Sequence, residues 1–373
     1  MKRIILVILT VLLVSAVIFG GCAKPAEPTT PTEPTKPAEP TKPTEPTKPA
    51  EPVKPIEWTF VSFMPPFDIF ATEPEERGKR LEEATGGRLK VTFYWAESLI
   101  KISGLLEAAI SGTADIALHP LAFYPERLSL AWIGGLPGIF EGPPQAGQTM
   151  ISLLNKYKEM RDQFLPCRVL WADTPGPFEL TSKRPVQTME DLKGLKISTG
   201  LKYEMLSYEA LGAVPVSVHP TEAYHALETG VIEASCLDFN GIFIWKLHEV
   251  TQYRIGNTLG MMSFMATSMN VDSYNKLPED VKQKFDELTD PMARTKAGNE
   301  AFVKFWAGSV EGIKEFDKKT GTGEFYYLPA EEHERWVETI WPVNEGWVEE
   351  NEAKGYPAKA ILEDTIAFAE QYK

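Results

Sequence analysis

The chain has 373 residues, of which 43% are hydrophobic and 24% are charged, with 38 basic and 52 acidic side chains. This composition is typical of a soluble globular protein, and the length suits two domains. The formal net charge is −14. It argues against a nucleic-acid partner, because contacts with phosphates need clustered Lys and Arg.

The first 21 residues have the layout of a secretory signal peptide. Residues 2–3 are basic, residues 4–19 form an almost unbroken apolar run, and Gly20 and Gly21 precede Cys22. The run is shorter than the roughly 20 apolar residues that a transmembrane helix needs. Small residues set against a Cys resemble a bacterial lipobox, so we expect cleavage before Cys22 and its lipidation. The alternative is an uncleaved anchor; both alternatives tether the protein to a membrane on the periplasmic or extracytoplasmic side.

Residues 22–55 join this leader to the rest of the chain. Proline recurs at every third position from 25 to 55, which is the period of a polyproline II helix. Lys and Glu balance within the segment, and it lacks apolar residues for a core. At about 3.1 Å per residue it would extend over roughly 100 Å. We therefore predict a lipidated Cys22 followed by a semi-rigid stalk; the alternative is a polyproline ligand for a partner domain.

The remaining segment, 56–373, carries a net charge of −16, because the leader holds two positive charges and the stalk is neutral. Glycines at the ends of apolar periodic stretches mark helix ends in its first part. The patterns there predict strands over 57–63, 89–95 and 114–118, and helices over 73–85 and 103–112.

Strand and helix patterns go on alternating in the second part, which indicates an α/β fold with mainly parallel sheets. Residues 108–117 and 226–235 are similar, each with a helix end, a Gly and an acidic strand. They suggest two related lobes. An equal alternative is that these are ordinary helix–Gly–strand connections, which any α/β protein can contain. The predicted elements are a capping box at 188–191, strands over 195–198 and 231–237, helices over 221–227, 277–288 and 291–316, and a largely helical stretch over 331–372 anchored by Trp336, Trp341 and Trp347.

Motifs for catalysis or for metal binding are not found in the sequence. The five histidines, at 119, 219, 225, 248 and 333, lack the spacing of metal ligands. Nucleophile elbows, zinc-protease motifs and phosphate-binding loops do not occur. We expect no cofactor, no metal and no catalytic residue, with a secreted enzyme that uses paired carboxylates as an alternative. Cys167 and Cys236 form either a disulfide or two buried thiols.

A series of segments resembles the solute-binding proteins of TRAP transporters, of the dicarboxylate-binding (DctP) type. Together they span about 56–288, in the order and spacing of that family. Each segment alone is weak evidence for the family, whereas the whole series is specific for it. The segments are Gly-Gly-Arg-Leu-Lys-Val at 86–91, Gly-Thr-Ala-Asp-Ile at 112–116, the stretch from Thr181 to Ile197, Leu-Gly-Ala-Val-Pro-Val at 211–216, the stretch from Glu222 to Glu233, and Leu-Pro-Glu-Asp at 277–280.

The resemblance implies a two-lobed periplasmic binding fold, of the type II-like Venus-flytrap kind, with a long hinge helix. Lobe I would comprise 56–175 plus 264–303, and lobe II 176–263 plus 304–373. A small ligand would sit between the lobes, and the closed form would deliver it to a small and a large TRAP membrane subunit. One alternative is a binding protein of an ATP-driven importer, which has a similar two-lobed fold but lacks these motifs. A structural cell-surface protein is another alternative, and it agrees poorly with the motifs.

Four residues depart from the family's pattern. Ser198 stands where most relatives carry an Arg that pairs with the ligand carboxylate. Phe178 lies near the position of a second Arg, and Cys236 and Leu237 replace a polar pair. We therefore predict a ligand that is less acidic, or more apolar or aromatic, than usual, because a buried carboxylate without a partner is costly.

The predicted cleft combines residues after the first strand, aromatic residues of both lobes and the positions just named. The alternative is a carboxylate ligand held by Arg127, Arg168 or Arg254, or by backbone amides at the start of the helix near Thr221. The candidate ligand-binding residues are Phe63, Met64, Phe67, Trp95, His119, Trp171, Phe178, Ser198, Thr199, Cys236, Asp238, Asn240 and Trp245.

Overall fold

A computed structural model describes residues 54–373 of the chain. The predicted signal peptide, Cys22 and the stalk up to residue 53 lie outside the described residues, so these predictions are not tested by the structure. None of the helices within 54–373 is both long and apolar enough to cross a membrane.

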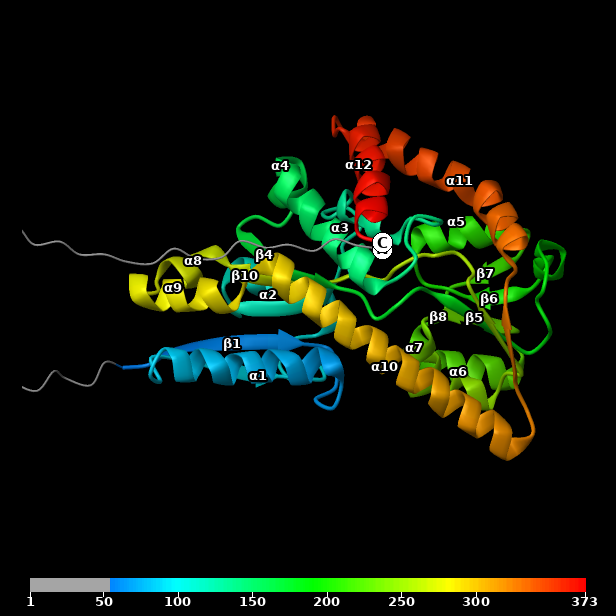
Figure 1. Ribbon diagram of the computed structural model, residues 1–373, viewed down its shortest axis with the longest axis horizontal. Helices are drawn as coiled ribbons and strands as arrows, with labels where there is room; N and C mark the ends of the chain where they lie inside the picture. Colours follow the sequence, from blue (N-terminus) through cyan, green and yellow to red (C-terminus); the bar gives the residue numbers. More distant parts are fainter. Residues whose placement is uncertain (1–53) are drawn as a thin grey trace, which may run out of the picture. The chain divides into compact units, whose positions relative to one another are not determined.

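The first half of the described chain builds a five-stranded sheet (Figure 1). Strand β1 (Ile56–Ser62) lies between β2 (Leu89–Tyr94) and β3 (Ile116–Pro120) and is parallel to both. Strand β10 (Met265–Asn270) comes from a distant part of the chain and pairs antiparallel with β3 and with β4 (Cys167–Asp173). The chain therefore leaves this sheet after β4 and returns to it at β10.

Helices surround this sheet and fill its apolar faces. The first of them begins where the Asp68 side chain accepts a hydrogen bond from the Phe70 amide at 2.9 Å, which is a usual N-cap arrangement. Trp58, Phe60 and Phe285 are buried between the sheet and its helices. The helices are α1 (Ile69–Ala84), α2 (Leu105–Ser111), α3 (Pro143–Lys156), α4 (Lys158–Asp162), α8 (Val271–Asn275) and α9 (Glu279–Leu288).

A second, six-stranded sheet follows, in the order β11-β9-β5-β8-β6-β7. β5 is antiparallel to both its neighbours, and the other pairs are parallel. The strands are β5 (Glu179–Ser182), β6 (Lys196–Ser198), β7 (Val214–Val216), β8 (Ala234–Leu237), β9 (Tyr253–Gly256) and β11 (Glu324–Tyr327). The associated helices are α5 (Lys202–Ala210), α6 (Pro220–Thr229) and α7 (Phe239–Ile244).

Two extended segments and one helix connect the sheets. The segment after β4 and the segment before β10 run side by side, joined by a bridge between Pro177 and Met262 and by a hydrogen bond from the Phe178 amide to the Met261 carbonyl at 2.8 Å. Helix α10 (Pro291–Thr320) runs from the first sheet to the second (Figure 1). The two sheets are thus linked at three places.

Helix α10 contacts both lobes along one of its faces. Phe302 packs on Phe70 of α1 with ring centroids 4.1 Å apart. Two turns later, Ser309 donates a hydrogen bond to the Asn240 side chain of α7 at 3.0 Å. The helix therefore touches the starts of α1 and α7, about 10 Å apart along its axis at 1.5 Å per residue.

The C-terminal helices α11 (Ala330–Glu352) and α12 (Ala358–Gln371) also contact both lobes. Trp347 of α11 donates to the Ser129 carbonyl at 3.0 Å, whereas Tyr203 of α5 donates to Glu350 at 3.3 Å. On α12, the Ala369 carbonyl accepts a hydrogen bond from Gln145 of α3 at 2.8 Å. The segment that we predict for lobe II therefore ends in a helix that packs on a helix of the lobe I segment.

The predicted elements are mostly present, with shifted ends. The strands predicted over 57–63 and 89–95 correspond to β1 and β2, and the predicted helix over 291–316 is α10. The capping box at 188–191 is present, with reciprocal hydrogen bonds between Thr188 and Asp191. The sequence pattern predicts that the first helix begins at residue 73, whereas it begins at Ile69, because Asp68 rather than a later residue caps it.

The two similar segments, 108–117 and 226–235, form the same unit in different sheets. Gly112 ends α2 with φ of 72°, and Gly230 ends α6 with φ of 77°; a strand follows each. Both glycines adopt the left-handed conformation that side chains disfavour. Cys167 lies on β4 and Cys236 on β8, and both are buried free thiols, which decides between the two alternatives for this pair.

Candidate ligand-binding cleft

The loop after β1 carries three of the candidate residues. Phe63 and Met64 are half-buried against the core of the first lobe. Phe67 has 75% of its side chain exposed, which is unusual for a ring placed directly before a buried helix cap. Its neighbour Asp68 is buried. This loop therefore offers an apolar ring to solvent beside a buried carboxylate.

The start of α7 faces this loop from the second lobe. Asp238 caps α7 by accepting hydrogen bonds from the Asn240 and Gly241 amides at 3.0 and 3.1 Å. Burial raises the pKa of Asp238 to about 6, and the charge of Asp68 adds to this increase. Trp245, the residue after α7, is 41% exposed. The loop after β1 and the start of α7 thus face each other near α10, each with a buried acid, whereas Trp245 lies at the opposite end of α7 from Asp238.

Ser198 is the last residue of strand β6 and Thr199 directly follows it, and both are buried. The side chains of successive strand residues point to opposite faces. Ser198 donates to the Val218 carbonyl at 3.4 Å, whereas Thr199 lies beside Glu204 of α5. Cys236 is on the side of Thr199, where its sulfur accepts a hydrogen bond from Tyr208 at 3.4 Å. The candidates of lobe II thus fall on two faces of its sheet.

Three other candidates lie in the core of the first lobe. Trp95 donates to Glu75 at 2.7 Å. His119 contacts the Ser268 hydroxyl at 2.9 Å, and complete burial lowers the pKa of the imidazole to about 3. Trp171 packs against two guanidinium groups, discussed below. The structure gives these residues packing partners, and we leave the three out of the proposed cleft.

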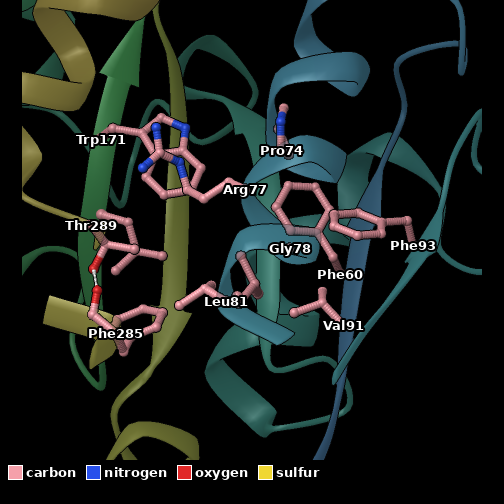
Figure 2. Close-up of a pocket in the computed structure, with 12 residues that line it drawn as sticks. Phe60, Pro74, Arg77, Gly78, Leu81, Val91, Phe93, Trp171, Phe285 and Thr289 are labelled. Carbon is pink, nitrogen blue, oxygen red and sulfur yellow. Dashed lines mark hydrogen bonds between the residues drawn. The ribbon is translucent and has the colours of Figure 1, made fainter. Parts of the chain in front are cut away.

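Trp171 packs against a charged cluster, defined as Glu73, Arg77, Asp173 and Arg294, of which Asp173 and Arg294 are buried and Glu73 and Arg77 are half-buried. The Arg294 guanidinium lies 4.7 Å from the Trp171 ring centre, and that of Arg77 lies 5.6 Å from it. Arg294 also makes two hydrogen bonds to Asp173, at 2.8 and 2.9 Å. Figure 2 shows Trp171 and Arg77 beside a cavity of about 20 Å³ between α1 and the first sheet. This cavity is apolar and too small for an organic solute.

The three arginines considered as carboxylate partners are engaged elsewhere. Arg127 donates to the Gln163 and Leu165 carbonyls. Arg168 pairs with Asp286 at 3.3 Å and stacks on Tyr274. These contacts hold both residues on lobe I, away from the loops that meet near α10.

Arg254 lies at the far end of α10 from those loops. It is buried on β9 and pairs with Asp317 at 2.9 Å. Asp317 follows Phe302 by fifteen residues, or about 22 Å along the helix. The start of α6, the other anion site considered, lies at exposed residues, where the His219 ring accepts from the Thr221 amide.

Sequence reasoning missed several residues of this region. Asp68 is not part of a recognised sequence motif, although an acidic residue before an apolar periodic stretch is a usual signal for a helix N-cap. Glu204 and Trp132 are buried polar residues whose significance depends on neighbours distant in sequence. Within residues 54–373, no group of three or more His, Cys, Asp or Glu side chains is placed to hold a metal ion.

The family model of the bacterial extracellular solute-binding proteins, family 7 (DctP), matches residues 71–351. The chain belongs to this family. This solute-binding protein is 27% identical over 281 residues to the C4-dicarboxylate-binding periplasmic protein DctP of Rhodobacter capsulatus, covering 72% of this chain and 79% of that one. It is 26% identical over 247 residues to the sialic acid-binding periplasmic protein SiaP of Vibrio cholerae, covering 62% and 74%.

Solved structures of TRAP solute-binding proteins have the same fold. A protein from Desulfovibrio salexigens in an open complex matches with a TM-score of 0.77 and 24% identity, covering 85% of this chain and 97% of that one. A protein from Rhodoferax ferrireducens, in complex with copurified benzoate, matches with a TM-score of 0.76 and 20% identity, covering 85% and 98%. A marine metagenome protein specific for aromatic acids matches with 0.75 and 20% identity, covering 85% and 99%.

These matches confirm the predicted family and the predicted two-lobed α/β fold. The protein is an extracytoplasmic solute-binding protein of the DctP family. Its relatives and structural neighbours bind solutes, so the protein is a binding protein and the enzyme alternative is wrong.

Proposed function

We propose that this solute-binding protein captures a small aromatic or apolar ligand, neutral or weakly acidic, in the cleft between its lobes. The proposal is carried by Ser198, which the resemblance to the family's motifs puts where most relatives have a carboxylate-binding Arg. A hydroxyl offers a carboxylate one neutral hydrogen bond, whereas an Arg offers two charge-assisted ones. Phe178, near the position of the second Arg, adds an apolar ring where a cation is usual.

The charges around the cleft support the same conclusion. Asp68 and Asp238 are buried acids on the loops that meet near α10, and their field opposes an anion. Arg127, Arg168 and Arg254 are bound to other groups. A carboxylate ligand would therefore enter a site whose fixed charges are negative.

Exposed aromatic rings on both lobes support an aromatic ligand. Phe67 and Trp245 lie on loops of opposite lobes, and aromatic side chains supply large contact areas for rings. Benzoate in the Rhodoferax protein and aromatic acids in the marine protein indicate that this fold accommodates a ring. Those ligands are acids. To bind them, the cleft of this protein would need another group to pair with the carboxylate in place of the Arg.

The second part of the proposal concerns how the protein is attached to the membrane and how it delivers its ligand. Cys22 is the lipidated N-terminus, and residues 22–55 are a stalk that holds the binding body near the membrane. Lobe I comprises 56–175 plus 264–303 and lobe II 176–263 plus 304–373, with the C-terminal helices lying across both. Closure around the ligand presents the protein to the small and large TRAP membrane subunits.

Calorimetric titration of the purified full chain tests the ligand class. Succinate and a simple 2-oxo acid represent the usual ligands, and benzyl alcohol and benzamide represent neutral aromatic ones. We expect the neutral aromatic compounds to bind and succinate to release no heat. Tight binding of succinate or of the 2-oxo acid, without binding of the neutral compounds, would refute the proposal in favour of an organic acid held by another Arg.

A further inference from the structure

Two buried carboxyls cap helices of opposite lobes near α10. Asp68, before α1, is 3% exposed and accepts a hydrogen bond from the Phe70 amide at 2.9 Å. Asp238, before α7, is 7% exposed and accepts from the amides of residues 240 and 241. No ion pair with a Lys, Arg or His side chain compensates either charge within residues 54–373.

Helix α10 holds these two caps at a short separation. The ring two residues after Asp68 packs on Phe302, and the amide side chain two residues after Asp238 accepts a hydrogen bond from Ser309. Phe302 and Ser309 are seven residues apart, or about 10 Å along the helix. Two like charges this close repel each other more strongly among buried groups than in water. Accordingly, the charge of Asp68 adds to burial in raising the pKa of Asp238 to about 6.

The elements around Asp238 bring one further carboxyl. Glu179 of β5 has its pKa raised to about 8, by burial first and in small part by the charge of Asp238. Its carboxyl accepts hydrogen bonds from two backbone amides of the loop after β9, so its partners lie within the segment that we propose for lobe II. On α10, Ser309 contacts α7 and Trp306 lies against the ring of its first residue, and both are uncharged. Of these charged groups, only Asp68 lies on the opposite lobe from Asp238.

We infer that repulsion between Asp68 and Asp238 couples closure of the lobes to the uptake of a proton by this pair. This inference rests on the proposed closure around a ligand and adds a regulation to it. Moving the lobes apart lengthens the distance between the two carboxyls and admits water to both, so the open form tolerates two negative charges. Closure brings the carboxyls together away from water, where a proton on one of them removes the repulsion.

The direction of the effect follows from the affinity of each form for the proton. An Asp in water has a pKa of about 3.9, and opening of the lobes would move the pKa of Asp238 back towards it. The pKa of about 6 applies to the arrangement with both caps on α10. Closure is therefore favoured as the pH falls towards 6 and is opposed above it. A ligand that does not titrate should bind about fourfold more tightly at pH 5.5 than at pH 8.

Calorimetric titration of the full chain with benzamide at pH 6, in two buffers of different ionisation enthalpy, measures the protons taken up on binding. We expect about half a proton per ligand for the unchanged protein. Asp238→Asn keeps an N-cap acceptor and should take up none. Asp68→Asn should take up less, and at pH 8 it should bind benzamide about threefold more tightly because the repulsion is gone. A purely structural role of Asp68 would weaken binding instead.

Three other carboxyl variants are controls, and each should keep the proton uptake of the unchanged protein. Asp290→Asn changes another N-cap, at the exposed start of α10, where the carboxyl accepts from the Ala293 amide at 2.6 Å. Glu204→Gln removes a buried carboxyl of lobe II whose pKa is also raised by burial. Glu209→Gln removes an exposed carboxyl of α5. Thermal unfolding without ligand checks that each variant is folded.

The outcomes separate the coupling from the proposed ligand class. Equal proton uptake in the unchanged protein and Asp238→Asn would overturn the coupling alone. Failure of benzamide and benzyl alcohol to bind would refute the ligand class, and urea unfolding at pH 8 without ligand then decides the coupling. There, the gain in the unfolding midpoint of the double variant Asp68→Asn with Asp238→Asn should be smaller than the sum of the two single gains, because the repulsion is relieved only once. Additive changes would show that the carboxyls do not interact and would overturn the coupling.

Discussion

At the scale of single residues, the proposed ligand class depends on Ser198. Ser198 was identified from the sequence because a motif fixes its position, and the structure describes it as a buried hydroxyl bonded to the Val218 carbonyl. Trp171 could not be assigned in this way. Its partners Arg77 and Arg294 are distant in sequence, and a buried aromatic ring in a core has the same local pattern as one in a cleft.

Restoring the missing cation tests the role of position 198. We expect Ser198→Arg to create benzoate binding, or to strengthen it at least tenfold, because charge-assisted hydrogen bonds contribute about 1.5–3 kcal/mol each. Ser198→Gln, which is long and polar but uncharged, is the control and should not bind benzoate. Calorimetry measures both variants. No gain in Ser198→Arg would mean that the surrounding residues also exclude acids.

Buried carboxyls should make the stability depend on pH. The pKa of Glu204 is raised by burial from about 4.5 to about 7 in the folded protein. The folded state therefore binds this proton more tightly than the unfolded state does. Its contribution to stability is complete below pH 4.5 and is lost as the pH rises through 7.

We expect the free energy of unfolding, measured in urea, to fall between pH 5 and pH 8, and Glu204→Gln to reduce this slope. Glu179, whose pKa burial raises to about 8, would keep part of the slope in that variant. Glu209→Gln should show the full slope. An identical slope in Glu204→Gln and the unchanged protein would contradict the assignment of a raised pKa to Glu204.

At the level of elements, the capping and glycine signals predicted the ends of helices well. The strands next to the crossing segments were not predicted. Gly112 and Gly230 end helices as expected. Strands β4, β5, β9 and β10 were missed because each pairs with strands far away in sequence. The stretch over 331–372 was predicted as largely helical, and the structure divides it near Gly355, where φ is 85°.

The charged cluster of Glu73, Arg77, Asp173 and Arg294 fixes α10 to the first lobe. Asp173 ends β4, where the chain starts to cross, and Arg294 lies in the first turns of α10. Removing one partner of a buried ion pair leaves an uncompensated charge and costs about 3–5 kcal/mol. We expect Arg294→Met to lower the free energy of unfolding by this amount, measured in urea.

Two further variants make this test specific. Arg335→Met removes an exposed pair with Glu190 and should leave the stability unchanged. The double variant Asp173→Leu with Arg294→Met leaves no unpaired charge on Asp173 and should recover part of the loss. A double variant less stable than Arg294→Met would show that packing, rather than charge, dominates at this position.

At the scale of the whole molecule, the sequence predicted the family, the two-lobed fold and the long helix between the lobes. It did not predict that α12 packs on α3, because Gln145 and Ala369 form a contact between distant segments that no local pattern records.

The proposed attachment to the membrane depends on Cys22, outside the residues that the structure describes. We expect Cys22→Ser to move the protein from the membrane fraction to the soluble fraction of cells, because the lipid anchor would be lost. Cys167→Ser, which changes a buried thiol, should stay with the membrane. Retention of Cys22→Ser in the membrane would support an uncleaved apolar anchor instead.

The two extended segments that cross between the sheets also constrain how the lobes move. The Pro177–Met262 bridge and the Phe178–Met261 hydrogen bond tie these segments into a narrow ribbon. Sliding one lobe past the other would break these pairings, whereas bending the ribbon across its thin direction leaves them intact. We therefore expect the ribbon to bend about one axis, so that closure of the lobes around a ligand would be a rotation with a defined direction.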